Sequence, residues 1–150
     1  AWSLRTDPRV VCMERTNIRY VTHEQIPEEM DVAVADLSFI SLRLILGAVG
    51  ALLKPEGEMV CLVKPQFEAG KDKVGKKGVV RDPAVHEEVL QNFISLAKSL
   101  DFTIRNLTFS PVKGPEGNIE FLAHLSMQPG EDSYLAPGDL VAQAHAALKG

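Results

Sequence analysis

Cysteine is scarce in this chain of 150 residues: Cys12 and Cys61 are the only two, and no Cys-x-x-Cys pair occurs. The sequence therefore has no disulfide framework and no typical zinc-ligand spacing. Both cysteines lie in apolar runs, where an unpaired cysteine usually behaves as a small buried hydrophobic residue. We expect two buried free thiols rather than a disulfide or metal pair, which fits a protein of the reducing cytoplasm.

Long apolar segments are also missing. The longest nearly uncharged run, residues 44–53, has about half the length that a helix needs to cross a bilayer. The first residues lack the basic-then-apolar pattern of a signal peptide, so we expect neither export nor a membrane span. The composition, 45% hydrophobic and 24% charged, is ordinary for a globular domain and excludes intrinsic disorder.

Nucleotide and metal motifs are incomplete. No Gly-x-Gly turn occurs, and residues 70–77 fit a phosphate-binding loop only until Lys77, where such a loop needs Ser or Thr for magnesium. We therefore do not expect an NTPase. The four histidines share no metal-ligand spacing and are expected to be ordinary surface or core residues: His23, His86, His124 and His145.

Charge is distributed unevenly along the chain, whose net charge is −4. Residues 64–81 hold six basic and two acidic side chains, whereas the rest of the chain holds ten basic and eighteen acidic ones. Such a basic loop on an acidic body can attract a polyanion locally. The alternative, a solvated flexible loop without a ligand, stays open on charge alone.

Hydrophobic periodicity predicts an open α/β sheet. We expect strands at 10–14, 31–36, 58–64, 102–109 and 118–125, and helices from Ser38 or Ser41 to Leu53, from Asp82 to Leu100, and over 139–148. The strand at 58–64 is almost continuously apolar, as in a strand covered on both faces. The last two strands are joined by a segment too short for a helix, so they should be antiparallel neighbours.

Three charged residues should meet at one edge of this sheet. Asp36 and Lys64 end two successive strands, and Glu120 lies near the start of the reversed final strand. Ligands of such folds collect at the carboxyl ends of the parallel strands. Singly, the three could be a helix cap, a solvated lysine and an outward-facing glutamate. Within apolar strands, however, such charges are costly unless they are paired.

Five sequence blocks resemble the catalytic part of the TlyA (hemolysin A) family, which belongs to the FtsJ-like RNA 2′-O-ribose methyltransferases. The blocks follow the family's order from Trp2 to Leu125: PRVVCMERTNIR, DVAVADLSFISL, LVKPQFEAGK, GVVRDPAVHEEV and PVKGPEGNIEFL. The resemblance implies a Rossmann-like fold and S-adenosylmethionine as cofactor. It further implies a catalytic Lys-Asp-Lys-Glu tetrad, whose last three members match Asp36, Lys64 and Glu120.

The same resemblance implies the binding residues and the partner. Asn17, Asp36 and Leu37 would contact the cofactor. Ribosomal RNA or a ribosomal subunit would be the partner, and its phosphates would meet the cations of the basic loop: Lys71, Lys73, Lys76, Lys77 and Arg81. No metal is implied.

The chain departs from the family in what it lacks. A first tetrad lysine, a glycine-rich cofactor loop, the first two strands and an S4-like RNA-binding domain would all precede Ala1. We therefore expect residues 1–150 to be the C-terminal portion of a single methyltransferase domain. Alone, this portion should be inactive, bind the cofactor weakly and tend to aggregate. Two other functions stay open: a non-catalytic RNA-binding module and a hemolysin-like membrane-active protein.

Overall fold

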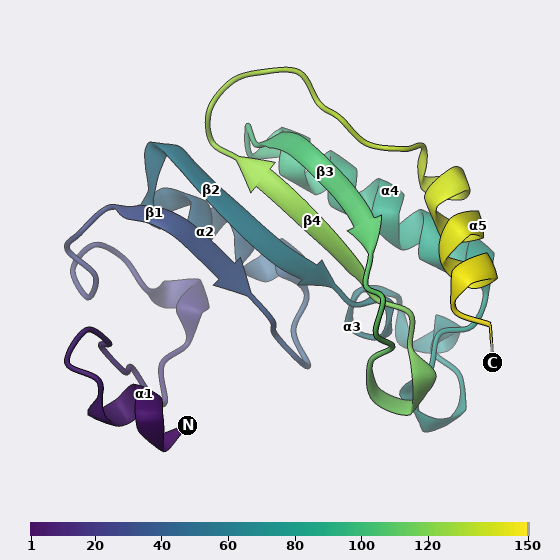
Figure 1. Cartoon of the computed structure of the whole chain (residues 1–150), viewed down its shortest axis with the longest axis horizontal. Helices are drawn as coiled ribbons and strands as arrows, with labels where there is room; N and C mark the ends of the chain where they lie inside the picture. Colours follow the sequence, from purple (N-terminus) through teal and green to yellow (C-terminus); the bar gives the residue numbers. More distant parts are fainter. Residues whose placement is uncertain (150) are drawn as a thin grey trace.

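The computed structural model describes residues 1–149, and its centre is one four-stranded sheet in the order β1-β2-β4-β3 (Figure 1). The strands are β1 (Met30–Ala35), β2 (Leu53–Val63), β3 (Thr103–Phe109) and β4 (Phe121–Ser126). β1 and β2 are parallel, while β4 is antiparallel to both β2 and β3. The α/β class and the antiparallel final pair are thus as the sequence predicts.

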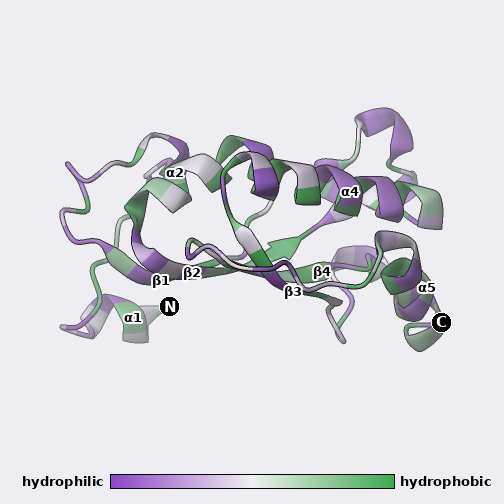
Figure 2. Cartoon of the chain, turned by 90° about the horizontal axis from the view of Figure 1, so that it is seen from above, coloured by the Kyte–Doolittle hydropathy of each residue, from purple (hydrophilic) through white to green (hydrophobic). Residues whose placement is uncertain are grey.

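The helices differ in their position relative to this sheet, and two of them cover one of its faces (Figure 2). In chain order, the helices are α1 (Trp2–Thr6), α2 (Leu46–Leu52), α3 (Pro65–Glu68), α4 (Pro83–Ser99) and α5 (Pro137–Ala147). Figure 2 shows α2 and α4 together on one face, with α5 at the far end. α4 begins where the sequence predicts, because the Asp82 carboxylate accepts a hydrogen bond of 2.9 Å from the Ala84 N–H. No helix among residues 1–149 is long and apolar enough to span a bilayer.

The core lies between the sheet and its helices, and α5 contributes buried residues to it as well as α2 and α4. Alternate residues of β2 (Met59, Cys61 and Val63) pair in register with Leu125, Ala123 and Phe121 of β4, and all six are at most 1% exposed. Full burial stabilises each large apolar side chain by about 1.5–3 kcal/mol. The other face of the sheet is open at β1, where Val32 and Val34 are 56% and 76% exposed. On β2, Val60 and Leu62 alternate with the buried residues and are only partly buried, so within residues 1–149 the expected cover of β2 is complete on one face only.

The expected strand at 10–14 is absent from the structure. Val11 is 84% exposed, and this segment pairs with no strand of residues 1–149. Without a ladder partner, an apolar run gains no burial in extended form. As a result Cys12 is exposed, contrary to expectation, whereas Cys61 is buried as predicted. Burial raises the pKa of the Cys61 thiol to about 12.

The helix expected from Ser38 or Ser41 to Leu53 is broken into two parts. The Ser41 hydroxyl caps a 3-10 turn at Leu42–Leu44 by accepting the Arg43 N–H, and α2 follows as a separate, shorter helix. β2 begins as soon as α2 ends. Within β2, Gly57 packs closely against Leu53, the first residue of the strand. A side chain would not fit there, since an added Cβ would lie 2.9 Å from the Leu53 Cβ.

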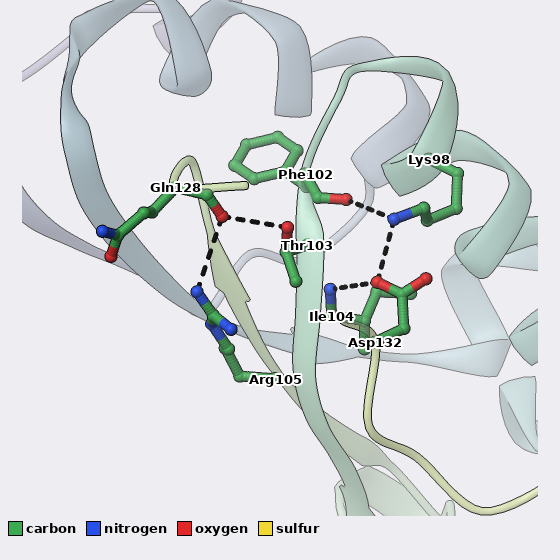
Figure 3. A network of polar contacts seen from close by, with 7 residues as sticks. All are labelled: Lys98, Phe102, Thr103, Ile104, Arg105, Gln128 and Asp132. Atoms are coloured by element: carbon green, nitrogen blue, oxygen red, sulfur yellow. Dashed lines mark hydrogen bonds and ion pairs between the residues drawn. The ribbon is translucent and has the colours of Figure 1, made fainter. Parts of the chain in front are cut away.

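The polar segment after β4 is tied down by the network in Figure 3. The Asp132 carboxylate accepts the Ile104 N–H at 2.9 Å and pairs with Lys98 Nζ at 2.8 Å. The Thr103 hydroxyl donates to the Gln128 carbonyl at 2.9 Å. Hydrogen bonding to Lys98 lowers the pKa of Asp132. This segment thereby leads the chain to α5, which starts two residues before its predicted beginning.

Candidate functional site

Asp36 and Lys64 form an ion pair at the carboxyl ends of the two parallel strands. Ala35 is in register with Cys61, so the residues that follow them leave the sheet at the same edge, where β4 begins (Figure 1). Lys64 Nζ lies 2.5 Å from Asp36 Oδ1. The lysine side chain is only 10% exposed, whereas the aspartate side chain is 65% exposed. A nearly buried ammonium group is thus held by a carboxylate that remains accessible to a ligand.

Glu120 reaches the same edge but has a different partner. It directly precedes β4 and is 6% exposed, and its Oε2 accepts a hydrogen bond of 2.7 Å from Gln66 Nε2. No Lys64–Glu120 ion pair within 4.0 Å occurs in the described part of the chain. Gly114 leaves room for the carboxylate, because an added Cβ would lie 2.9 Å or less from its atoms. The expected convergence is present, but Gln66 orients Glu120.

The side-chain carbonyl oxygen of Gln66 is left without a hydrogen bond. Gln66 Oε1 is buried and has no hydrogen-bond partner, a state that costs about 1–3 kcal/mol for a buried acceptor. Flipping the amide would not relieve it, since Oε1 would then face the oxygen of Glu120. The amide is therefore held in one orientation, with its Nε2 toward the carboxylate of Glu120.

Asn118 fixes the loops around Glu120. It is 2% exposed, and its Nδ2 donates to the carbonyls of Gly78 and Pro115, each at 3.0 Å. Its Oδ1 accepts the Val80 N–H at 3.0 Å. One buried amide thus joins the basic loop to the connection between β3 and β4, directly before Glu120.

Glu68 fixes the loop that follows Asp36. Its two carboxylate oxygens accept the Ser41 hydroxyl at 2.6 Å and the Leu42 N–H at 2.8 Å. Burial raises the pKa of Glu68, and these two hydrogen bonds oppose the rise. The loop after β1 is therefore tied to α3, the short helix that begins beside Lys64.

Phe39 projects from this loop into solvent. It is 90% exposed, has a φ of +63° and lies with its ring centroid 4.9 Å from that of Phe67. A left-handed backbone is uncommon for a bulky aromatic residue and is concentrated at functional sites. The arrangement presents an aromatic face close to the Asp36–Lys64 pair.

The basic loop is only partly available for an anion. Lys73 Nζ contacts both carboxylate oxygens of Glu88, at 2.7 and 2.8 Å, so the charge of this predicted RNA contact is already paired within the protein. Lys76 and Arg81 line a cavity of about 420 Å³ together with Lys73. Lys71 and Lys77 are the remaining cations of the predicted set, and both lie in exposed 3-10 turns.

The other predicted cofactor contacts are less distinctive. Asn17 is exposed, and its side chain accepts the Arg19 N–H as the cap of a short 3-10 turn. Leu37 is half-buried against the core, next to Asp36. Within residues 1–149, neither side chain hydrogen-bonds to the Asp36–Lys64 pair, so their cofactor roles remain predictions.

The histidines form no metal site. Among residues 1–149, no group of three or more His, Cys, Asp or Glu side chains could hold a metal ion. His86 is fully buried, and its Nδ1 lies 2.8 Å from His145 Nε2. Burial lowers the pKa of His86, so the imidazole is neutral at pH 7.

Four residues of the site were not found by sequence reasoning: Phe39, Gln66, Glu68 and Asn118. Gln66 and Glu68 follow Lys64-Pro65 at alternate positions, where a polar pair in an otherwise apolar segment was a usable signal. Asn118 offered a weaker sequence signal, because it is an amide in the glycine- and proline-rich link before Glu120. Nothing in the sequence signals the backbone conformation of Phe39.

The chain is similar to known proteins over most of its length. Residues 1–127 match the family model of the FtsJ-like methyltransferases. The 16S/23S rRNA (cytidine-2′-O)-methyltransferase TlyA of Mycobacterium tuberculosis is 43% identical over 148 residues, which cover 99% of this chain and 54% of the relative. Hemolysin A of Brachyspira hyodysenteriae is 41% identical over 124 residues, which cover 82% of this chain and 52% of that protein.

Solved structures agree with the sequence matches. A hemolysin-named protein from Streptococcus thermophilus superposes with a TM-score of 0.91 at 42% identity, covering 99% of this chain and 55% of its own. S-adenosylmethionine-dependent methyltransferases from Methanosarcina mazei share the fold, with a TM-score of 0.53 at 14% identity over 86% of this chain and 76% of theirs. The chain spans about half the length of the curated relatives it matches. It belongs to the FtsJ-like methyltransferase family.

Proposed function

We propose that the protein transfers a methyl group from S-adenosylmethionine to a ribose 2′-hydroxyl of ribosomal RNA. Residues 1–150 would form the C-terminal portion of one methyltransferase domain. Preceding chain would supply its other strands, its glycine-rich cofactor loop, its first catalytic lysine and an S4-like RNA-binding domain. The half-length match to the curated relatives supports this arrangement.

One observation carries the proposal: the nearly buried Lys64 ammonium group held by the exposed Asp36 carboxylate at the ligand edge of the sheet. A surface ion pair elsewhere would be uninformative, because exposed pairs contribute little. Here, however, the pair ends two parallel strands, and the buried Glu120 lies at the same edge. Together with family membership, this favours a catalytic role over a non-catalytic RNA module.

The residues fit the proposed cofactor at its reacting end. A sulfonium is cationic, and Asp36 and Glu120 place carboxylates at the edge where it would lie. When bound, S-adenosylmethionine supplies an electrophilic methyl group whose bond to sulfur breaks with the electron pair left on sulfur. Asp36 and Leu37 would contribute to holding it, and Asn17 would approach its adenosine end.

Lys64 would act on the ribose. Its Nζ would hold the 2′-hydroxyl oxygen in line with the methyl carbon. As the new C–O bond forms, the hydroxyl proton would leave to water, or to this nitrogen when Lys64 has first lost a proton to solvent and is a neutral amine. Alignment of two reactants in this way accounts for a large share of many catalysed rates. Asp36 would fix the lysine, while Gln66 and Glu120 would fix the other side of the site.

The basic loop and the exposed Phe39 would bind RNA. Lys71, Lys76, Lys77 and Arg81 would contact backbone phosphates, whereas Lys73 is engaged by Glu88. Phe39 would offer its exposed ring to an unstacked base, the usual way in which proteins hold single-stranded RNA.

The test is the chemical identity of the product. Full-length protein is incubated with methyl-labelled S-adenosylmethionine and ribosomal RNA, and the product is digested to nucleosides and separated by mass spectrometry. We expect the label on the ribose oxygen, and none on an RNA fragment whose target nucleotide is 2′-deoxy. Label on a base, or no label on any ribosomal RNA or subunit offered, would contradict the proposal.

A further inference from the structure

A cavity of about 410 Å³ lies beside the edge that carries Glu120. Its walls come from the β3–β4 connection, the start of α4 with the residues before it, and the end of α5. These segments gather at one corner of the molecule, around the C-terminus in Figure 1. No residue of α5 belongs to the site described above, so the cavity is a separate feature.

Cationic side chains dominate this cavity. Arg81, Lys113 and Lys149 line it, and Glu116 contributes one opposing carboxylate. Arg81 makes no hydrogen bond or ion pair with the described residues, so its guanidinium can bind an anion through two parallel hydrogen bonds. In a chain of net charge −4, such a local excess of positive charge favours an anionic ligand.

Two histidines order the wall of the cavity. His86 Nε2 lies 2.9 Å from the Val80 carbonyl oxygen, which can only accept, so this nitrogen carries the proton. The Nδ1 of neutral His86 must then accept the N–H of His145 Nε2, at 2.8 Å. The ring of His145 is thereby fixed in the wall of the cavity, where it can report on a bound ligand. With the proton on Nε2, the Nδ1 of a neutral ring can only accept a hydrogen bond.

Arg81 also lines the neighbouring cavity, which it shares with Lys73 and Lys76 of the basic loop. Two cation-lined cavities that share one arginine suit a ligand with repeated phosphates. A single carboxylate or a sugar would use only one of them.

We propose that the cavity binds a backbone phosphate of the RNA substrate, with Arg81, Lys113 and Lys149 as its cationic groups, and that Arg81 bridges this phosphate to the next one in the basic loop. The inference rests on the proposed function only in one respect: it takes RNA as the source of the phosphate. The phosphate chemistry of the cavity is independent of methyl transfer.

The first experiment uses inorganic phosphate as probe. The ring resonances of His145 are followed by NMR in the full-length protein during a phosphate titration. We expect a saturable shift in the wild type that is lost in both Arg81→Gln and Lys149→Gln, and is kept in Lys54→Gln, whose lysine lies at the opposite end of β2. Lys149 follows the last helix, so its replacement leaves the fold intact. Unmoved His145 resonances would overturn the proposal.

The second experiment measures binding of a ribosomal RNA fragment at several salt concentrations, without a methyl donor. Each phosphate neutralised on a single strand contributes about 0.7 to the slope of log affinity against log salt, so Lys149→Gln and Arg81→Gln, which each remove one positive charge, should each flatten the slope by about 0.7. If phosphate binds but neither variant changes the slope, the cavity takes free phosphate and the RNA assignment is wrong. Absence of methylation with both results intact would contradict the proposed function alone.

Discussion

At the scale of single residues, the site is built from buried polar groups whose partners are specific. Lys64 has Asp36, Glu120 has Gln66, and Asn118 satisfies three backbone groups. Such groups are costly when unpaired, which makes each of them sensitive to substitution. The sequence was sufficient to place the three charged residues at one edge, because strand ends and strand direction follow from hydrophobic pattern. It was insufficient to show that an amide holds Glu120, since that depends on side-chain geometry.

Gln66 should act as a positioning residue for Glu120. We expect Gln66→Leu, which keeps the volume and removes the donor, to lower kcat about tenfold while KM for S-adenosylmethionine is unchanged. Gln66→Glu should move the acid limb of the pH–rate profile to higher pH, because two adjacent carboxylates share a proton. Gln91→Leu on the exposed surface of α4 is the matched control. An unshifted profile for Gln66→Glu would show that Gln66 serves packing only.

The two cysteines should differ in reactivity. A thiolate is the reactive species, and burial raises the pKa of Cys61 to about 12, so it is almost wholly protonated at pH 8. Cys12 is exposed. We expect one thiol per chain to react rapidly with Ellman's reagent in native protein, and none in Cys12→Ser. Two rapidly reacting thiols would mean that the β2 core opens readily.

At the scale of elements, the sequence predicted helices and strands correctly where neighbouring residues alone determine the structure. α4 follows from its Asp82-Pro83 start and its apolar face, and β3 and β4 from alternating patterns closed by a short link. The expected strand at 10–14 failed, because a strand exists only with a neighbour to pair with, and hydrophobicity alone does not provide one. The helix after β1 is capped at Ser41, one of its two predicted starts, but its first turn is a 3-10 turn and α2 follows as a separate helix.

The contact between α4 and α5 should make stability depend on pH. His86 has a pKa lowered by burial, so it is neutral in the folded state, while in the unfolded chain it gains a proton below about pH 6.5. The free energy of unfolding should therefore fall as pH decreases from 7.5 to 5.5, by no more than about 1.4 kcal/mol per pH unit from this group.

Urea unfolding of His86→Gln tests this expectation. The variant should be less stable at pH 7.5, since the bond between His86 and His145 is lost, but its stability should change less with pH. His23→Gln, at an exposed position, should retain the pH dependence of the wild type. A variant of His86 that keeps the full pH dependence would refute the role of this residue.

At the scale of the whole molecule, one edge and one face of the sheet lack cover within the described residues. β1 is an edge strand, and Val32 and Val34 on its open face are largely exposed. Open edges with apolar side chains promote pairing with other chains. We expect the 150-residue chain to self-associate in sedimentation velocity, and Val34→Lys to reduce that association. A wild-type chain that stays monomeric at high concentration would contradict this expectation.

The central claim is that Lys64 performs the chemistry of a ribose methyltransferase. The most direct test is the single-turnover rate of methyl transfer to ribosomal RNA by full-length Lys64→Met, which keeps the stem of the side chain and removes the amine. Because a positioned acid–base group typically contributes 10²–10⁴-fold, we predict a rate at least about 10²-fold below wild type, with an unchanged circular dichroism spectrum and unchanged RNA binding. Lys54→Gln should retain the wild-type rate. Transfer by Lys64→Met at close to the wild-type rate would contradict the account.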